Sequence, residues 1–295
     1  MLIPAAQAQH QRLQKQIEFE GLSEATSSCF RQCIYDYYHR AGRDFPWRSS
    51  TEPYHIFISE IMLQQTQTDR VLKKYPAFIK EFPDFQTLSS SSLPEILSLW
   101  QGLGYNRRAL ALKKSAHIIT AEHGGILPDN PDILKQLPGI GKATAASISV
   151  FAFNKPIVFI ETNIRTVYLY FFFSGADHVS DHQIIPLVDR TLDRHNPHKW
   201  YSALMDFGAD LKKTCRHLNK KSAHYTRQSP FKGSNRRIRG LVLKILLQQG
   251  KIHLQTLIET VGERPQRVET IIRQLQSEGF LELQGPWCYL RNEPA

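Results

Sequence analysis

The feature that most constrains this chain is an apolar periodicity of three and four residues, which continues through residues 29–211. This spacing gathers apolar side chains on one side of a helix and predicts an amphipathic α-helix wherever it occurs. The predicted helices cover residues 56–67, 93–101, 108–122, 142–153, 163–173 and 184–194. Short turn signals such as Gly124-Gly125 and Asn130-Pro131 separate them. The chain is therefore expected to have an all-α body.

The last part of the chain carries a different pattern. Helical periodicity over residues 238–247, 254–261 and 264–278 precedes two short apolar runs around Gly285-Pro286, which predict a β-hairpin. Three helices and a hairpin resemble a winged helix-turn-helix domain, whose third helix reads the major groove. The candidates for groove contacts on that helix are Arg264, Gln266, Arg267 and Arg273. A module that packs against protein is the alternative.

These patterns divide the chain into four segments. We expect a weakly ordered leader at residues 1–28, where the sequence is polar and poorly patterned. A helical domain at 29–215, a basic linker at 216–237 and a small C-terminal domain at 238–295 follow.

Positive charge is concentrated between Lys212 and Lys244. That segment holds eleven Lys and Arg and no Asp or Glu, whereas the net charge of the whole chain is +10. Because each phosphate that a basic side chain neutralises releases counterions, such a segment suits a polyanion. A solvated linker with incidental charge is the alternative.

Several classes of protein are excluded by composition. The sequence has no run of about 18 uncharged apolar residues for a membrane span, and its first eight residues lack the basic flank of a signal peptide. The four cysteines are scattered, as in proteins of a reducing compartment, and offer no disulfide framework. We therefore expect a globular protein of the cytoplasm, associated with the nucleoid, with no membrane contact.

The most distinctive local motif is Leu137-Pro138-Gly139-Ile140-Gly141-Lys142, between two predicted helices. Two glycines around one apolar residue allow a tight turn that points backbone N–H groups at a phosphate. Lys142 and Thr144 can add phosphate contacts at the start of the next helix. The motif has the form of a helix-hairpin-helix DNA anchor, and an ordinary turn is the alternative.

Two carboxylates stand in unusual surroundings. Glu60 is the one acid in the apolar and amide-rich segment 59–67, where burial would raise its pKa and make it a general acid. An exposed glutamate beside Gln64 and Gln67 is the alternative. Glu161 follows the apolar run 157–160 and is placed to accept hydrogen bonds at a helix N-terminus. For Glu161, capping and catalysis are compatible.

These features occur together in one order, and residues 45–209 resemble the helix-hairpin-helix DNA glycosylases, most closely adenine glycosylases of the MutY kind. The shared motifs are Phe45-Pro46-Trp47-Arg48, Pro53-Tyr54, residues 59–67, Trp100-Gln101-Gly102-Leu103-Gly104-Tyr105, the Leu137–Gly141 hairpin and residues 204–209. The resemblance implies a two-lobed helical body with the small winged-helix-like domain appended. It also implies that double-stranded DNA with a mismatched or damaged base is the partner.

The resemblance assigns roles to individual residues. Glu60 would protonate the departing base, while Glu161, held by Asn163, would stabilise the positively charged sugar. Residues implied to contact DNA are Gln65, Thr66, Tyr105, Leu137, Gly139, Gly141, Lys142 and Thr144, with Gln65 and Tyr105 filling the gap that a flipped nucleotide leaves. Residues implied to form the base pocket are Trp47, Arg48, Leu63 and Ser202.

The sequence departs from the family at several positions. Glu161 stands where the family carries aspartate, and Ser202 replaces the Glu or Gln that reads the adenine amino group. Ala143 occupies the position of the lysine with which bifunctional relatives attack the sugar, so a monofunctional enzyme is expected. Lys212 occupies the first ligand position of the family's iron-sulfur cluster, and Cys215 stands alone, so no cluster or other cofactor is expected.

The expected activity is hydrolysis of the N-glycosidic bond of adenine opposite guanine or 8-oxoguanine, by a monomeric enzyme. A glycosylase for uracil or thymine opposite guanine is the first alternative, and Glu161 and Ser202 favour it. A catalytically silent DNA-binding protein is the second, although the retention of Glu60, Gln65, Tyr105 and Asn163 argues against it.

Overall fold

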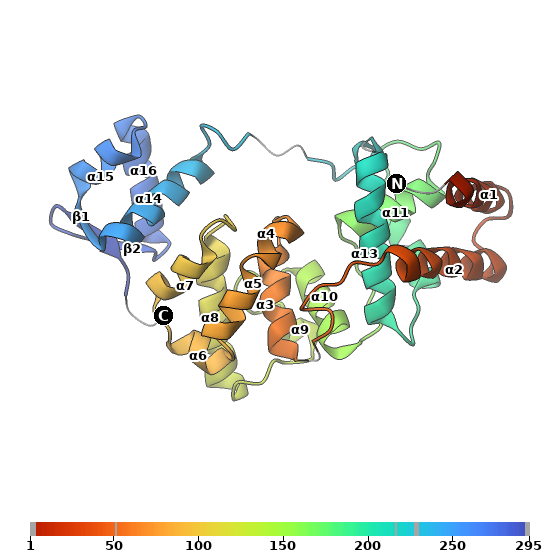
Figure 1. Cartoon of the computed structure of the whole chain (residues 1–295), viewed down its shortest axis with the longest axis horizontal. Helices are drawn as coiled ribbons and strands as arrows, with labels where there is room; N and C mark the ends of the chain where they lie inside the picture. The colour runs from red at the N-terminus through yellow and green to blue at the C-terminus, as the bar shows by residue number, and fades with distance from the viewer. Residues whose placement is uncertain (1–3, 51, 216, 227–229, 293–295) are drawn as a thin grey trace. The chain divides into compact units, whose positions relative to one another are not determined.

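A computed structural model describes residues 4–50, 52–215, 217–226 and 230–292 (Figure 1). The first three residues of the expected leader, positions 216 and 227–229 of the expected linker, and residues 293–295 lie outside the described residues. The chain forms two compact units. Unit 1 comprises the described residues within 1–49 and 141–227, and unit 2 those within 50–140 and 228–295.

Unit 1 is entirely helical apart from its loops and one isolated bridge. Its helices are α1 (Pro4–Glu20), α2 (Glu24–Ala41), α10 (Lys142–Phe153), α11 (Thr162–Phe172), α12 (Asp181–Thr191), α13 (Pro197–Thr214) and a 3-10 turn at Leu218–Lys221. Helix α13 packs along α11 and against α2, as Figure 1 shows in teal, green and red. Their shared core is aromatic, with Phe30, Tyr168, Trp200 and Phe207 almost fully buried.

Helix α1 corrects the expectation of a weakly ordered leader. Residues 4–20 are helical, and α2 already begins at Glu24, where Ser23 forms a capping box with Thr26. Leu13 and Ile17, one helical turn apart, are buried in the core of unit 1. Packing of these two side chains supplies the stability that the polar sequence of the helix does not predict.

Unit 2 contains the remaining elements. Its first segment folds as α3 (Pro53–Leu63), α4 (Thr68–Leu72), α5 (Tyr75–Glu81), α6 (Phe85–Ser90), α7 (Leu93–Trp100), α8 (Arg107–His123) and α9 (Pro131–Leu134). Its second forms α14 (Asn235–Gln249), β1 (Lys251–His253), α15 (Leu254–Val261), α16 (Pro265–Ser277), β2 (Leu281–Gln284) and β3 (Trp287–Leu290). Helix α8 packs against α6 and α7, and α14 contacts α7.

The prediction of a mostly helical fold is confirmed, and the predicted hairpin is present as β2 and β3. The strand β1 was missed, because three residues are too short for a periodic signal. It pairs antiparallel with β3, so the sheet has the order β1-β3-β2. The winged-helix assignment and the predicted domain boundaries stay predictions. No helix in the described ranges is long and apolar enough to cross a membrane.

Candidate functional site

Glu60 lies on α3 in unit 2, on a helix whose apolar side chains are almost all buried. Ile56, Phe57, Ile58, Ile61 and Met62 have at most 2% of their surface exposed. Glu60 itself is half-buried. Glu60 thus lies between the expected burial and the exposed alternative, because it belongs to the partly exposed side of an otherwise buried helix.

The end of α3 differs from the prediction and creates the first unusual backbone. The periodicity predicts a helix through residue 67, but the helix ends at Leu63 and Gln65 adopts a φ of 52°. Left-handed backbone at a residue other than glycine is uncommon and is concentrated at functional sites. Gln65 is exposed, and the adjacent Gln64 donates from Nε2 to the carbonyl of Gly139, at 3.2 Å.

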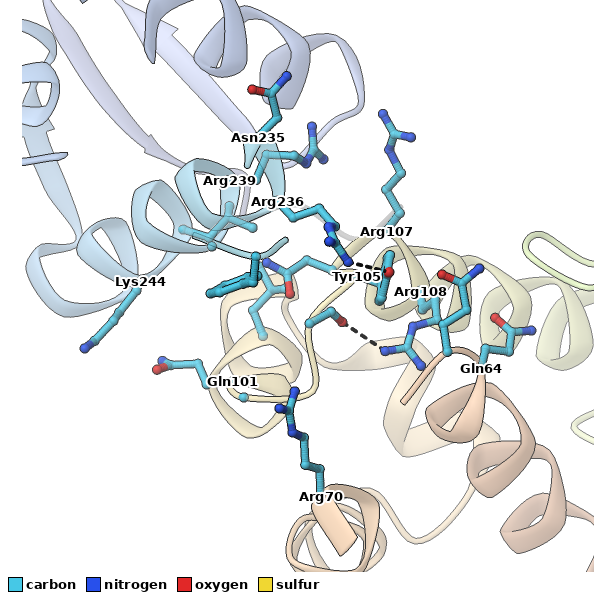
Figure 2. A pocket seen from close by; sticks show the side chains of 18 of the residues that line it. Gln64, Arg70, Gln101, Tyr105, Arg107, Arg108, Asn235, Arg236, Arg239 and Lys244 are labelled. Carbon is cyan, nitrogen blue, oxygen red and sulfur yellow. Dashed lines mark hydrogen bonds between the residues drawn. The ribbon is translucent and has the colours of Figure 1, made fainter. Parts of the chain in front are cut away.

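Tyr105 has the same backbone conformation in the loop before α8, with a φ of 47°. Its hydroxyl accepts a hydrogen bond from Arg236 on α14, at 2.8 Å (Figure 2). The guanidinium carbon of Arg236 also lies 5.6 Å from the centre of the Tyr105 ring. The two residues expected to fill the gap in the DNA, Gln65 and Tyr105, thus belong to the same unit and line one pocket.

Arg108 joins the two unusual turns, and sequence reasoning missed it. Its Nη1 donates to the carbonyls of Ile61 and Met62 at 2.8 and 2.7 Å, at the end of α3. Its Nη2 donates to the Thr66 hydroxyl at 2.8 Å and to the Gly104 carbonyl at 3.0 Å. Burial lowers the pKa of Arg108 to about 10, so the side chain stays charged at neutral pH. The sequence does hold one signal for this buried role, because Arg108 lies on the apolar face of α8, one turn before Leu112.

The hairpin motif is built as a tight turn. Leu137 is 3% exposed, and Gly139 has a φ of +77°. A Cβ at Gly139 would lie 3.0 Å from the side chain of Ala111, so both backbone and space favour glycine. Gly141 caps the N-terminus of α10, Lys142 is exposed and Thr144 is half-buried. Gly141, Lys142 and Thr144 belong to unit 1, and Leu137 and Gly139 to unit 2.

In unit 1, Glu161 caps helix α11. Its Oε1 accepts hydrogen bonds from the backbone N–H groups of Asn163 and Ile164, at 2.7 and 3.0 Å. The Asn163 side chain donates from Nδ2 to Glu161 Oε2 at 3.4 Å and accepts at Oδ1 from Lys212 Nζ at 2.6 Å. Gly208 allows the backbone of Asn163 to lie this close to α13, because a Cβ at position 208 would lie 2.2 Å from the Asn163 carbonyl oxygen. Glu161 caps the helix as expected, and the contact of Lys212 with Asn163 is a feature that the sequence did not predict.

The residues expected to form a base pocket belong to both units, and the structure describes the surroundings of each. Arg48 donates from both terminal nitrogens to the carboxylate of Asp206, at 2.8 Å each, so its guanidinium is used for an ion pair. Trp47 is 7% exposed and stacks on Phe45. Ser202 is 1% exposed, and within the described residues its hydroxyl has no hydrogen-bond partner. Leu63 is half-buried and belongs to unit 2.

The residues present do not fit an iron-sulfur cluster. Cys215 is half-buried beyond the end of α13, Cys29 and Cys33 lie on α2, and Cys288 lies in unit 2. Lys212 donates to Asn163, so its side chain belongs to the Glu161 cluster. No group of three or more His, Cys, Asp or Glu that could hold a metal occurs among the described side chains.

Several known proteins are similar to this chain in part of its sequence or in fold. A family model described as the HhH-GPD superfamily of base excision DNA repair proteins matches residues 58–192. The adenine DNA glycosylase of Buchnera aphidicola subsp. Baizongia pistaciae is 38% identical over 215 residues, a match that covers 66% of this chain and 60% of that protein. The adenine DNA glycosylase of Homo sapiens is 34% identical over 205 residues, with 65% and 37% covered.

Among solved structures, a thermostable thymine-DNA glycosylase aligns with a TM-score of 0.58 and 28% identity, covering 68% of this chain and 96% of that one. The chain spans 60% of the length of the Buchnera adenine DNA glycosylase and 37% of that of the human one.

Proposed function

We propose that the protein is a DNA glycosylase that releases mismatched adenine, on the premise that residues 58–192 match the family model of the HhH-GPD superfamily of base excision DNA repair proteins. The observation that carries the proposal is the cluster at the start of α11, where Glu161 is held by Asn163 and by two backbone N–H groups. A carboxylate fixed in this way can stabilise positive charge on a sugar.

The proposed reaction is hydrolysis of one glycosidic bond. Glu60 donates a proton to the departing base and then accepts one from the attacking water, while Glu161 stabilises the oxocarbenium-like sugar between the two steps. Ala143, exposed on α10, offers no amine to attack the sugar. Water is then the nucleophile, and the product is an abasic site.

Binding of the substrate follows from the same proposal. The nucleotide leaves the helix before it can react, and Gln65 and Tyr105 take its place in the stack. The backbone of the hairpin, with Lys142 and Thr144, binds phosphate. The proposed partner is double-stranded DNA, bound by a monomer in the cytoplasm at the nucleoid.

A second candidate is removal of thymine or uracil opposite guanine. The longer carboxylate of Glu161, the short hydroxyl of Ser202 and the 28% identity to a thymine-DNA glycosylase favour it. In this case the mechanism of glycosidic-bond hydrolysis is the same, and only the groups that read the base differ.

Single-turnover base release from four duplexes tests both candidates. The duplexes carry adenine opposite 8-oxoguanine, adenine opposite guanine, thymine opposite guanine and uracil opposite guanine, and alkali converts abasic sites to strand breaks. We expect adenine release that Glu60→Gln reduces by at least about 100-fold and that Glu81→Gln, a change at an exposed glutamate of the same unit, leaves intact. Release of thymine or uracil alone would support the second candidate. Binding without any release would indicate a silent DNA-binding protein.

A further inference from the structure

A pocket of about 620 Å³ lies within unit 2, between the loop that precedes α8 and one face of α14 (Figure 2). Its positively charged lining residues are Arg70, Arg107, Arg108, Arg236, Arg239 and Lys244. Of the described residues that line it, none is Asp or Glu. The residues Gln65 and Tyr105 line it as well. The positive charge of the pocket thus surrounds the residues that we expect to enter the DNA.

An ion-pair cluster joins α14 to the start of α8 at the edge of this pocket. The carboxylate of Glu278, just after α16, accepts from Arg107 Nε at 2.9 Å and from Arg239 Nη1 at 3.0 Å. Burial alone would raise the pKa of Glu278, but its hydrogen bonds to both arginines outweigh burial and lower it. One carboxylate therefore serves two arginines, and the cluster keeps a net positive charge. In the described part of the chain, neither Arg70 nor Lys244 forms a salt bridge.

Helix α14 presents groups that suit a nucleic-acid backbone. Arg236 lies in the first turn, where the helix dipole favours an anion, and its guanidinium contacts Tyr105. Lys244, two turns later, is exposed (Figure 2). Phe231, before the helix, is 63% exposed and gives the pocket an aromatic face on which a base can stack.

Helix α16, the expected reading helix, is less suited to this role. Arg267 donates to Asn235 Oδ1 at 2.9 Å and to the carbonyl of Gly233 at 2.7 Å, so it stabilises the start of α14. Gln266 and Arg273 line a second pocket, of about 530 Å³, together with the acidic Glu269. Its one basic residue is thus offset by one acidic residue.

We propose that the segment from α14 to β3, residues 235–290, contacts duplex DNA through α14, with Arg236 and Lys244 binding backbone phosphates beside Tyr105. Helix α16 then does not read the groove. This inference rests on the proposed function, since it takes DNA as the partner. It replaces the expectation that Arg264, Gln266, Arg267 and Arg273 read the major groove.

The salt dependence of binding to a duplex that already holds an abasic site tests this inference without requiring base release. The slope of log K against log salt is negative, and each lost phosphate contact reduces its magnitude by about 0.9. We expect Arg236→Gln and Lys244→Gln each to weaken binding and to reduce the slope by about that amount. The matched variants Arg264→Gln, just before α16, and Arg273→Gln on α16, both at exposed residues, should leave the slope unchanged.

A slope that responds to the α16 variants, or to none of the four, would overturn the inference. Lys244→Gln decides the matter if Arg236→Gln fails to fold, because Lys244 is exposed. Failure of the proposed function is distinguishable. A protein that releases no base but shows the reduced slope keeps α14 as its DNA contact.

Discussion

At the scale of single residues, Lys212 brings a positive charge into the carboxylate cluster of unit 1. Its ammonium orients the Asn163 amide, because Oδ1 accepts from the lysine and Nδ2 is then left to face Glu161. Burial lowers the pKa of Lys212 from its ordinary value of 10.5, Glu161 opposes the change, and Arg165 adds to it. The Lys212 ammonium, which donates to Asn163, therefore loses its proton at a lower pH than an exposed lysine does.

Replacement of Lys212 by Met should slow base release by about 10- to 100-fold, because small displacements of reacting groups cost factors of this size. DNA affinity and the melting temperature should change little. In the wild type, the rate should fall as pH rises toward 10.5, and this alkaline decrease should be absent from Lys212→Met. Single-turnover rates across pH check both points, with the exposed neighbour Lys213→Met as the control. If both variants gave the same rates, Lys212 would have no positioning role.

At the scale of elements, Arg108 connects the C-terminus of α3 to the loop that carries Tyr105. The acceptors that it satisfies lie as far as 47 residues away in the sequence. Because these acceptors would be left without a donor, Arg108→Met should lower the free energy of unfolding by about 2–4 kcal/mol. Lys114→Met, an exposed position on the same helix, should have little effect. Urea denaturation measures the difference.

The same substitution should also impair base flipping more than DNA affinity, because Arg108 supports the backbone of Gln65 and Tyr105 and is itself 8% exposed. Fluorescence of 2-aminopurine next to the target base reports flipping. Normal flipping by a stable Arg108→Met protein would show that the two turns keep their conformation without the arginine.

At the scale of the whole molecule, Asp206 stabilises unit 1 through ion pairs with Arg43 and Arg48. Its side chain has no exposed surface, and it accepts hydrogen bonds from Arg48 and from the backbone and side chain of Arg43. Burial alone would raise the pKa of Asp206, but the two arginines outweigh it and hold the pKa below its ordinary value of 3.8. The contribution to stability is therefore fully present above pH 3.8 and is lost as pH falls below it.

Asp206→Asn should destabilise the protein at neutral pH by about 3–5 kcal/mol, since it leaves partly buried arginines without their charge partner. The difference from the wild type should shrink in acid. Urea titrations at pH 7 and at pH values below 3.8 test this, and the exposed Asp177→Asn is the matched control. A difference that did not change with pH would mean that Asp206 acts through packing instead of charge.

Several parts of the fold could be predicted because they depend on neighbours in the sequence. Residues 142–153 and 254–261 form helices with the predicted bounds, and the Gly285-Pro286 turn joins the predicted strands. The glycine at position 139 also follows from local backbone geometry. The resemblance to the HhH-GPD superfamily also rests on motifs that are local in the same sense.

What the sequence by itself determined was therefore the helical fold class, the hairpin turn and the motifs through which the chain resembles the HhH-GPD superfamily. Only the tertiary structure decided the exposure of Glu60, the end of α3 at Leu63 and the packing of α1. It also decided which acceptors Arg108, Arg48 and Lys212 satisfy. The physical reason is that burial and the pairing of charges depend on segments distant in the sequence, whereas helix periodicity and turn geometry depend on adjacent residues.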